Sequence, residues 1–327
     1  MAPSAEKWKD EGIPRGLDDE HLPAAGRHSS LARDASGIGK AQAMGLLEGK
    51  TVFITGGGRG QGRAHAIASA REGADILFVD TTKPFASVPY PHTTAEDMAE
   101  TVRLVEEQDR RVLSIEADVR DQAALDAAVA QGIAQFGKID VLIANAGIWT
   151  LAPIAELTTE TWREMIDINL TGVFQSVKSV VNHMIERQTG SMVLTSSING
   201  LEGGPGYAHY ASAKFGVVGL MKSLALDLGP HGIRVNTVNP GAILTGMTDN
   251  QMAWDMFAGH PGGTHEDLVR GGYSFGILKG VGMLDPMEIA NAAVWLNSDM
   301  ARTVTGITLP VDAGHLGMPG INMNPQM

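Results

Sequence analysis

Tyr210 and Lys214 are the two residues whose types and spacing point most directly to chemistry. They are separated by Ala-Ser-Ala, and on a helix this spacing places both side chains on one face, about one turn apart. An ammonium beside a phenol stabilises the phenolate, which brings a group of ordinary pKa about 10 closer to neutral pH. Tyr210 is therefore a candidate general acid or base. Because the same spacing is common on ordinary helix surfaces, other residues must support the assignment.

Ser197 and Asn169 precede this pair in the chain and are the polar residues that support it. Ser197 follows an apolar run that predicts a strand, so its hydroxyl would lie at a strand end, within reach of a substrate oxygen. It does not lie in the Gly-x-Ser-x-Gly turn of serine hydrolases, which disfavours a Ser-His-Asp hydrolase. The chain contains no cysteine, which excludes disulfides, thiol nucleophiles and thiolate zinc sites. Catalysis must then use oxygen and nitrogen groups, and we expect no metal.

The elements that would position these residues alternate between short apolar runs and helical stretches. Val141–Ala144 is apolar throughout, as expected for a strand that helices cover on both faces. The pattern indicates a Rossmann-type, doubly wound α/β fold with a parallel seven-stranded sheet. We assign residues 49–327 to one catalytic domain and the polar residues 1–48 to an N-terminal arm. The predicted strands are Thr51–Thr55, Ala74–Val79, Val112–Glu116, Val141–Asn145, Met192–Ser196, Val235–Asn239 and Gly306–Val311.

A glycine-rich segment follows the first predicted strand and precedes a helix that we expect to start near Arg63. Glycines in this context let the backbone approach a pyrophosphate at the helix N-terminus. A tight turn that needs glycine for its backbone angles is the alternative. The residues that we assign to cofactor binding here are Gly56, Arg59, Gly60, Gln61 and Gly62.

Asp80 ends the second predicted strand, about twenty residues beyond the glycine loop. A carboxylate there accepts hydrogen bonds from the adenosine ribose, which indicates NAD. Arg59 could hold the 2′-phosphate of NADP, but Asp80 would repel that phosphate, so we favour NAD. Asp118 and Val119 follow the third strand, where they would contact adenine, and Asn145-Ala146-Gly147 follows the fourth beside the cofactor. Ordinary strand-end turns are the alternative for these two segments.

In their order along the chain, the glycine loop, Asn-Ala-Gly, Asn169, Ser197 and Tyr210-x-x-x-Lys214 resemble the motifs of the short-chain dehydrogenase/reductases over residues 49–315. The resemblance implies that Tyr210 is the general acid/base, while Lys214 lowers its pKa and binds the nicotinamide ribose. Ser197 would orient the substrate oxygen, and Asn169 would hold a water in a proton relay through Lys214. The likeness also places four residues near the nicotinamide, namely Pro240, Gly241, Ile243 and Thr245. It further implies a homotetramer, assembled through helices around residues 162–187 and 210–228.

A narrower likeness is carried by residues 60–66, by 90–91 with 94–97, by 118–121 and by 308–314. These segments resemble the carveol-dehydrogenase-like, mycofactocin-associated group of the same family. That resemblance implies that NAD is held in a poorly exchangeable way and that secondary alcohols, often terpenoid ones, are oxidised. The long N-terminal arm departs from the usual pattern of the group.

Two segments interrupt the alternation of strands and helices. Residues 81–94 contain three prolines and directly follow Asp80, so we expect them to close over the adenosine half of NAD and slow its release; a surface excursion is the alternative. Residues 241–285 follow the sixth strand and are predicted to form a lid over the substrate. The residues that would line an apolar pocket, or else belong to the core, are Ile148, Trp149, Leu201, Met247, Trp254, Met256 and Phe257.

Charge and hydropathy exclude several classes of partner. The formal net charge of −12, with no basic cluster, disfavours nucleic acid. The first fifty residues hold no apolar stretch long enough for a signal peptide or a membrane span, so we expect no membrane partner and a cytoplasmic location. The sequence thus predicts an NAD(H)-dependent oxidoreductase that interconverts a small, apolar secondary alcohol and its ketone. The alternatives are a freely exchanging NAD(P)H ketone reductase and a catalytically idle dinucleotide-binding scaffold.

Overall fold

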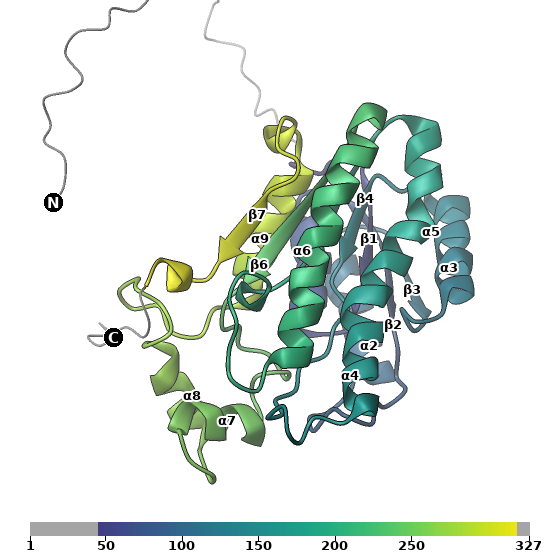
Figure 1. The fold of residues 1–327 in the computed structure, drawn as a ribbon. Coiled ribbons are helices and arrows are strands. Elements are labelled where there is room, and N and C mark those ends of the chain that lie inside the picture. Colours follow the sequence, from purple (N-terminus) through teal and green to yellow (C-terminus); the bar gives the residue numbers. More distant parts are fainter. Residues whose placement is uncertain (1–44, 319–327) are drawn as a thin grey trace, which may run out of the picture. The chain divides into compact units, whose positions relative to one another are not determined.

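A computed structural model describes residues 45–318 and contains one parallel sheet of seven strands, in the order β3-β2-β1-β4-β5-β6-β7 (Figure 1). The strand order reverses between β1 and β4, and in such sheets this switch point opens a crevice at the carboxyl ends of the strands. The predicted doubly wound fold is therefore confirmed. The strands are β1 Thr51–Thr55, β2 Asp75–Asp80, β3 Val112–Glu116, β4 Val141–Ala144, β5 Gly190–Thr195, β6 Ile233–Pro240 and β7 Thr308–Val311.

Nine α-helices accompany the sheet in the described part of the chain. Helices α3, α5 and α6 pack on one face, while α1, α2 and α9 pack on the other. A π-helical segment, Asp167–Thr171, joins α4 to α5. The helices are α1 Gly60–Arg71, α2 Ala95–Glu106, α3 Gln122–Phe136, α4 Thr159–Ile166, α5 Gly172–Arg187, α6 Ala208–Leu228, α7 Gln251–Ala258, α8 His265–Gly272 and α9 Pro286–Asn297.

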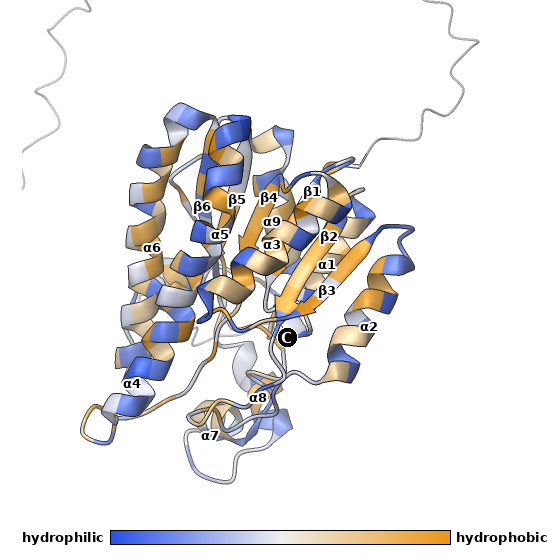
Figure 2. Ribbon diagram, turned by 90° about the vertical axis from the view of Figure 1, so that its right-hand side faces the viewer, coloured by the Kyte–Doolittle hydropathy of each residue, from blue (hydrophilic) through white to orange (hydrophobic). Residues whose placement is uncertain are grey.

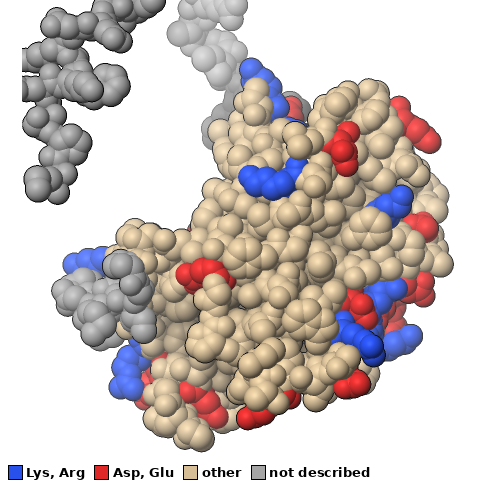
Figure 3. Space-filling model, in the orientation of Figure 1, with Lys and Arg blue, Asp and Glu red and all other residues tan. Residues whose placement is uncertain are grey.

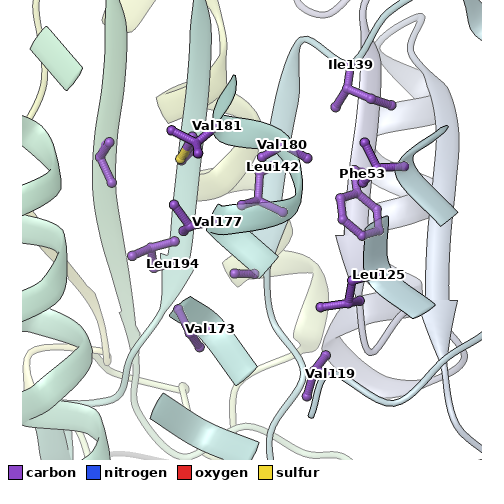
Figure 4. Packing of buried hydrophobic residues seen from close by; sticks show 14 of the residues in the cluster. Phe53, Val119, Leu125, Ile139, Leu142, Val173, Val177, Val180, Val181 and Leu194 are labelled. Carbon is purple, nitrogen blue, oxygen red and sulfur yellow. The ribbon is translucent and has the colours of Figure 1, made fainter. Parts of the chain in front are cut away.

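The strands are apolar on both faces, and alternate residues enter two different cores. In β4, Leu142 and Ala144 join the core under α3, α5 and α6, whereas Val141 and Ile143 join the core under α1 and α9. Figure 2 shows the strands β1, β2 and β3 as hydrophobic ribbons, and Figure 4 shows Leu142 among the side chains of the first core. Burial on both sides fixes the sheet, so the loops at its carboxyl edge are held by rigid elements.

Residues 45–48, which we placed in the N-terminal arm, pack on the domain. Leu47 is fully buried, and its backbone N–H donates to the carbonyl of Glu72 at 2.9 Å. The predicted boundary at residue 48 therefore moves to before Gly45. The remainder of the predicted arm, residues 1–44, lies outside the described residues.

Candidate active site

The glycine loop lies between β1 and α1 and brings the backbone close to a pocket, which we call the glycine-loop pocket. Gly56 and Gly60 have φ of 70° and 53°, in the left-handed region that favours glycine. A Cβ at Gly62 would overlap the carbonyl oxygen of Gly56. Helix α1 begins at Gly60, earlier than the predicted start near Arg63, so the unpaired N–H groups of its first turn border the pocket. This arrangement suits a bound anion such as a pyrophosphate.

Asp80 lies at the carboxyl end of β2, on the wall of the same pocket. Its carboxylate accepts hydrogen bonds from the backbone N–H groups of Gly58 and Thr81, both at 2.8 Å, and from the Thr93 hydroxyl at 3.3 Å. Burial raises the pKa of Asp80, while these three bonds favour the ionised form. The carboxylate is thus fixed in place, with lone pairs left for the hydroxyls of a ligand.

The structure brings together the residues that the sequence assigned to the cofactor. Twelve of them line the glycine-loop pocket: Gly56, Arg59, Gly60, Gln61, Gly62, Asp80, Asp118, Val119, Asn145, Ala146, Gly147 and Thr245. A second pocket, here called the tyrosine pocket, shares Gln61, Asn145, Gly147 and Thr245 with it and is also lined by Tyr210, Lys214, Pro240, Gly241 and Ile243. Asp118 is engaged by Arg120, whose Nη2 donates to it at 2.6 Å, so its contact with adenine stays a prediction.

The four predicted catalytic residues all line the tyrosine pocket. Tyr210 and Lys214 lie on α6, and the Lys214 ammonium is 5.6 Å from the centre of the Tyr210 ring. Lys214 is almost fully buried and donates to the Thr195 carbonyl at 2.9 Å. Ser197, just beyond β5, forms a hydrogen bond with the Tyr210 phenol. The geometry therefore presents a phenol and a hydroxyl together to any oxygen that enters the pocket.

The pKa values of this pair differ from the prediction that Lys214 brings Tyr210 toward neutrality. Desolvation raises the pKa of Tyr210 to about 12, although the bond with Ser197 acts in the opposite direction. Desolvation also lowers the pKa of Lys214 to about 8. Burial thus outweighs the attraction between ammonium and phenolate, because Lys214 itself carries its charge at a cost. The protein's own groups keep the phenol protonated at neutral pH.

Asn169 occupies the π-helical segment, and its side chain holds the loop after β4. Its Oδ1 accepts from the Ile148 N–H at 2.9 Å, and its Nδ2 donates to the Ile148 carbonyl at 2.8 Å. A Cβ at Gly147 would approach the Asn169 Oδ1 to 2.5 Å, so only glycine fits between the loop and this amide. The Asn169 amide is therefore occupied by Ile148, and the water relay implied by the family likeness stays a prediction.

The walls of the tyrosine pocket are apolar and come from distant parts of the chain. Of the predicted lining residues, Ile148, Trp149, Met247, Met256 and Phe257 line it, whereas Leu201 and Trp254 do not. Trp254 belongs instead to the packing between α7 and α8, where its Nε1 donates to Asp249 at 2.8 Å and its ring meets His265. The prediction missed the lining residues Tyr207, Phe275 and Met283.

The missed residues had only a weak sequence signal. Tyr207 lies one helical turn before Tyr210, but no lysine follows it at the matching spacing, so nothing marked it for the pocket. Phe275 and Met283 fall in the predicted lid, residues 241–285, where many apolar residues compete for the same role. Helices α7 and α8 of this segment lie beyond the carboxyl ends of the strands, as a lid would require (Figures 1 and 2).

Residues 81–94, which we call the strap, run along the glycine-loop pocket and reach the loop after β4. Thr81, Phe85 and Thr93 line the glycine-loop pocket. The Ser87 N–H and hydroxyl donate to Glu164 on α4 at 2.9 and 2.5 Å, which anchors the middle of the strap. The strap then reaches Trp149, whose N–H donates to the Tyr90 hydroxyl at 2.9 Å. The strap thus lies against the site, which argues against a surface excursion.

Two kinds of feature are absent from the part of the chain that the structure describes. Over residues 45–318, no helix is long and apolar enough to cross a membrane. In the same stretch, no group of three or more His, Cys, Asp or Glu side chains is placed to hold a metal ion. The cytoplasmic location stays a prediction.

Comparison with known proteins agrees with this geometry. A family model described as short chain dehydrogenase matches residues 50–256. An uncharacterized oxidoreductase of Mycobacterium tuberculosis is 45% identical over 279 residues, which cover 82% of this chain and 96% of that protein. The (-)-trans-carveol dehydrogenase of Rhodococcus erythropolis is 41% identical over 274 residues, covering 83% of this chain and 99% of that protein.

A solved structure is similar in fold as well as in sequence. The crystal structure of carveol dehydrogenase from Mycobacterium avium in complex with NAD has a TM-score of 0.81 and 42% identity, and covers 84% of this chain and 100% of that one. The predicted family and the predicted likeness to carveol dehydrogenases are therefore confirmed. With more than half of its length matched by the family model, the chain belongs to the short-chain dehydrogenase family.

Proposed function

We propose that the protein is an NAD(H)-dependent oxidoreductase that interconverts an apolar secondary alcohol and its ketone. The observation that carries the proposal is the placement of Tyr210, Ser197 and Lys214 in an apolar pocket that opens onto the glycine-loop pocket. The tyrosine pocket supplies the groups for proton transfer, and the glycine-loop pocket fits a dinucleotide. The names of the relatives from Rhodococcus erythropolis and Mycobacterium avium support an alcohol of the carveol type.

The residues of the chain perform the proton part of the reaction. When bound, NAD supplies the acceptor for the hydride that leaves the carbinol carbon of the alcohol. The substrate oxygen lies between the Ser197 hydroxyl and the Tyr210 phenol, and Tyr210 in its phenolate form takes the hydroxyl proton. Because Tyr210 is protonated in the protein alone, oxidation depends on the positive charge of NAD⁺ and of Lys214 to favour the phenolate. In the reverse direction, the protonated phenol donates to the developing alkoxide.

NAD is the proposed cofactor, in preference to NADP. Asp80 holds a fixed carboxylate where the adenosine ribose would lie, and a 2′-phosphate there would meet a like charge. The guanidinium of Arg59, which also lines this pocket, forms no hydrogen bond or ion pair within residues 45–318, so it is available to a phosphate of the dinucleotide. The relative from Mycobacterium avium was crystallised with NAD.

The test is a rapid-mixing measurement on protein purified without added cofactor. (−)-trans-Carveol, cyclohexanol and a primary alcohol are each added, and NADH is followed by its near-ultraviolet absorbance. We expect the secondary alcohols to give a burst of up to one NADH per subunit, and added NAD to restore any missing amplitude. Absence of NADH with every alcohol, in excess NAD or NADP, would support an idle scaffold. Fast multiple turnover with added NAD would instead support a freely exchanging enzyme.

The strap makes slow exchange of NAD part of the proposal. It is anchored at Asp80, at Glu164 and at Trp149, and its three prolines limit the freedom that it loses on closing. We therefore expect bound NAD to exchange with isotopically labelled NAD about tenfold faster when the strap is shortened between Thr82 and Thr94. Equal exchange rates in the intact and shortened proteins, with unchanged melting temperatures, would contradict this role.

A homotetramer is also proposed, through α5 and α6. The face that carries α6 shows few charged side chains (Figure 3), and it exposes Phe215 on α6. Phe174 on α5 is exposed to a similar degree, at 46% against 48% for Phe215. Exposed aromatic side chains on neighbouring helices favour an interface between copies of the chain. Light scattering on the wild type and on Phe174→Asp with Phe215→Asp tests this, since the double variant should dissociate.

A further inference from the structure

The loop after β4, residues 145–150, is held by side chains from four separate elements. The Asn145 N–H donates to Thr55 Oγ1 on β1 at 3.1 Å, and the Ile148 N–H donates to Asn169 at 2.9 Å. The Trp149 N–H donates to the Tyr90 hydroxyl, and the Thr150 hydroxyl bonds with His209 Nε2 on α6, both at 2.9 Å. Three of these contacts come from the sheet and its helices. The contact from Tyr90 comes from the strap.

We propose that Tyr90 is a positioning residue that couples closure of the strap to the shape of the tyrosine pocket. The proposal rests on the proposed function, because it assumes that the strap covers NAD and that the tyrosine pocket binds the alcohol. It adds that the strap supports the wall of the substrate pocket in addition to slowing release of the cofactor.

The contact between Tyr90 and Trp149 is shielded from solvent. Tyr90 is 5% exposed and Trp149 is 6% exposed. Burial raises the pKa of Tyr90 above its usual range, so the phenol stays neutral and its oxygen remains a hydrogen-bond acceptor. If the strap lifts, the Trp149 N–H loses its partner in a position that is shielded from water. The loop must then shift at Trp149 to find another acceptor.

A shift of Trp149 reaches the catalytic residue through one intermediate ring. The Trp149 ring lies 6.2 Å from the Tyr207 ring, and the Tyr207 ring lies 6.3 Å from the Tyr210 ring. Trp149 and Tyr207 both line the tyrosine pocket. Movement of Trp149 therefore alters the apolar wall against which the substrate packs, whereas Ser197 and Lys214 keep their own hydrogen bonds, to Asn199 and Thr195. The effect belongs in the binding of the alcohol more than in proton transfer.

Ser87 supplies a matched control on the same strap. Its N–H and hydroxyl bond with Glu164 on α4, and no hydrogen bond joins it to residues 145–150. Ser87→Ala therefore loosens the strap without removing the acceptor of the Trp149 N–H. Tyr90→Phe keeps the aromatic ring and removes the hydroxyl alone. The two variants separate loosening of the strap from loss of the coupling.

The experiment compares both variants with the wild type as purified holoproteins loaded with NAD. Hydrogen–deuterium exchange is measured on the peptide that contains the Trp149 amide. Exchange of labelled NAD, the melting temperature, and kcat and KM with (−)-trans-carveol complete the set. For Tyr90→Phe we expect the Trp149 amide to exchange about tenfold faster. We also expect a several-fold rise in KM and a pH profile of kcat like that of the wild type. For Ser87→Ala we expect faster NAD exchange and a much smaller change in the amide and in KM than for Tyr90→Phe, because the Tyr90 hydroxyl still accepts from Trp149 whenever the strap is closed.

The outcomes distinguish this proposal from the one on which it rests. If Tyr90→Phe leaves both the Trp149 amide and KM unchanged, the coupling is refuted, even where NAD exchange becomes faster and the strap keeps its role as a lid. If Tyr90→Phe and Ser87→Ala change the amide and KM equally, the strap acts as a whole and Tyr90 has no particular role. If the wild type oxidises no alcohol, the proposed function is refuted. The amide measurement then still decides whether Tyr90 positions the loop.

Discussion

The two pockets of the site are built in different ways. The glycine-loop pocket is lined mostly by residues at the carboxyl ends of β1, β2, β3 and β4 and in the loops that follow them, where the sheet fixes the backbone. The tyrosine pocket is formed by side chains, several of them from the long segment 241–285 with α7 and α8. The difference teaches that cofactor recognition follows from the sheet itself, whereas substrate recognition depends on packing between distant segments. The two functions should therefore be separable by mutation.

Tyr210→Phe should separate them most strongly. The variant keeps the ring and removes the transferable proton, so we expect turnover to fall by roughly 10²–10⁴-fold. NAD binding, measured by calorimetry, should change little. Tyr273→Phe is the matched control, because Tyr273 lines neither pocket and should retain full turnover. Near wild-type turnover of Tyr210→Phe would show that another group moves the proton.

Lys214→Met tests whether the catalytic pocket costs stability. Burial lowers the pKa of Lys214 from its ordinary 10.5 to about 8. Keeping the buried lysine protonated therefore lowers the free energy of unfolding by on the order of 3 kcal/mol. The variant should therefore unfold at higher denaturant concentration at pH 7, while turnover is lost. Part of this gain is offset by the lost bond to the Thr195 carbonyl.

The pH dependence of this difference has a defined sign. Below pH 8, Lys214 is protonated in both the folded and the unfolded chain, and the full cost is present. Between pH 8 and about 10.5 the unfolded chain binds more protons, so the wild type gains stability as pH rises and the advantage of Lys214→Met disappears. Lys222→Met, at an exposed lysine on the same helix, should show neither effect. A variant advantage that grows with pH would contradict the assignment.

Asp80→Ala should affect the other pocket, with a smaller effect. It removes the acceptor for the ribose hydroxyls together with the charge that repels a 2′-phosphate, so NAD binding should weaken about tenfold and NADP binding should strengthen. Asp126→Ala, at an exposed position on α3, serves as the control. If the ratio of the two affinities stays as in the wild type, cofactor selection resides in another residue.

The sequence predicted the glycine-loop pocket more completely than the tyrosine pocket. The strands β1 and β3 were predicted to the residue, and the cofactor residues from Gly56 to Gly147 meet in one pocket, because glycine spacing and strand ends report directly on backbone geometry. Trp254 was misplaced and Tyr207 was missed, because apolar residues in a loop carry no period that says which way they face. The bond between Tyr90 and Trp149 joins two loops, and no local pattern encodes it.

The pKa of Tyr210 shows a further limit. A Tyr and a Lys at helical spacing predict that the ammonium stabilises the phenolate and lowers the pKa of the tyrosine. The sequence does not show how deeply both side chains are buried. In the structure, desolvation outweighs that attraction and raises the pKa of the phenol to about 12. Burial is a property of the whole fold, so this outcome could not be read from the motif.

The central claim is that a hydride passes between a secondary alcohol and NAD within this site. It is tested most directly with an alcohol that carries deuterium on its carbinol carbon, mixed with the purified protein and quenched after a single turnover. The cofactor is released by denaturation, which removes any dependence on slow exchange, and is analysed by mass spectrometry. We predict one deuterium in the nicotinamide of the released NADH, and its loss in Tyr210→Phe. Ketone formed without deuterium in the nicotinamide, or no ketone at all, would contradict the account.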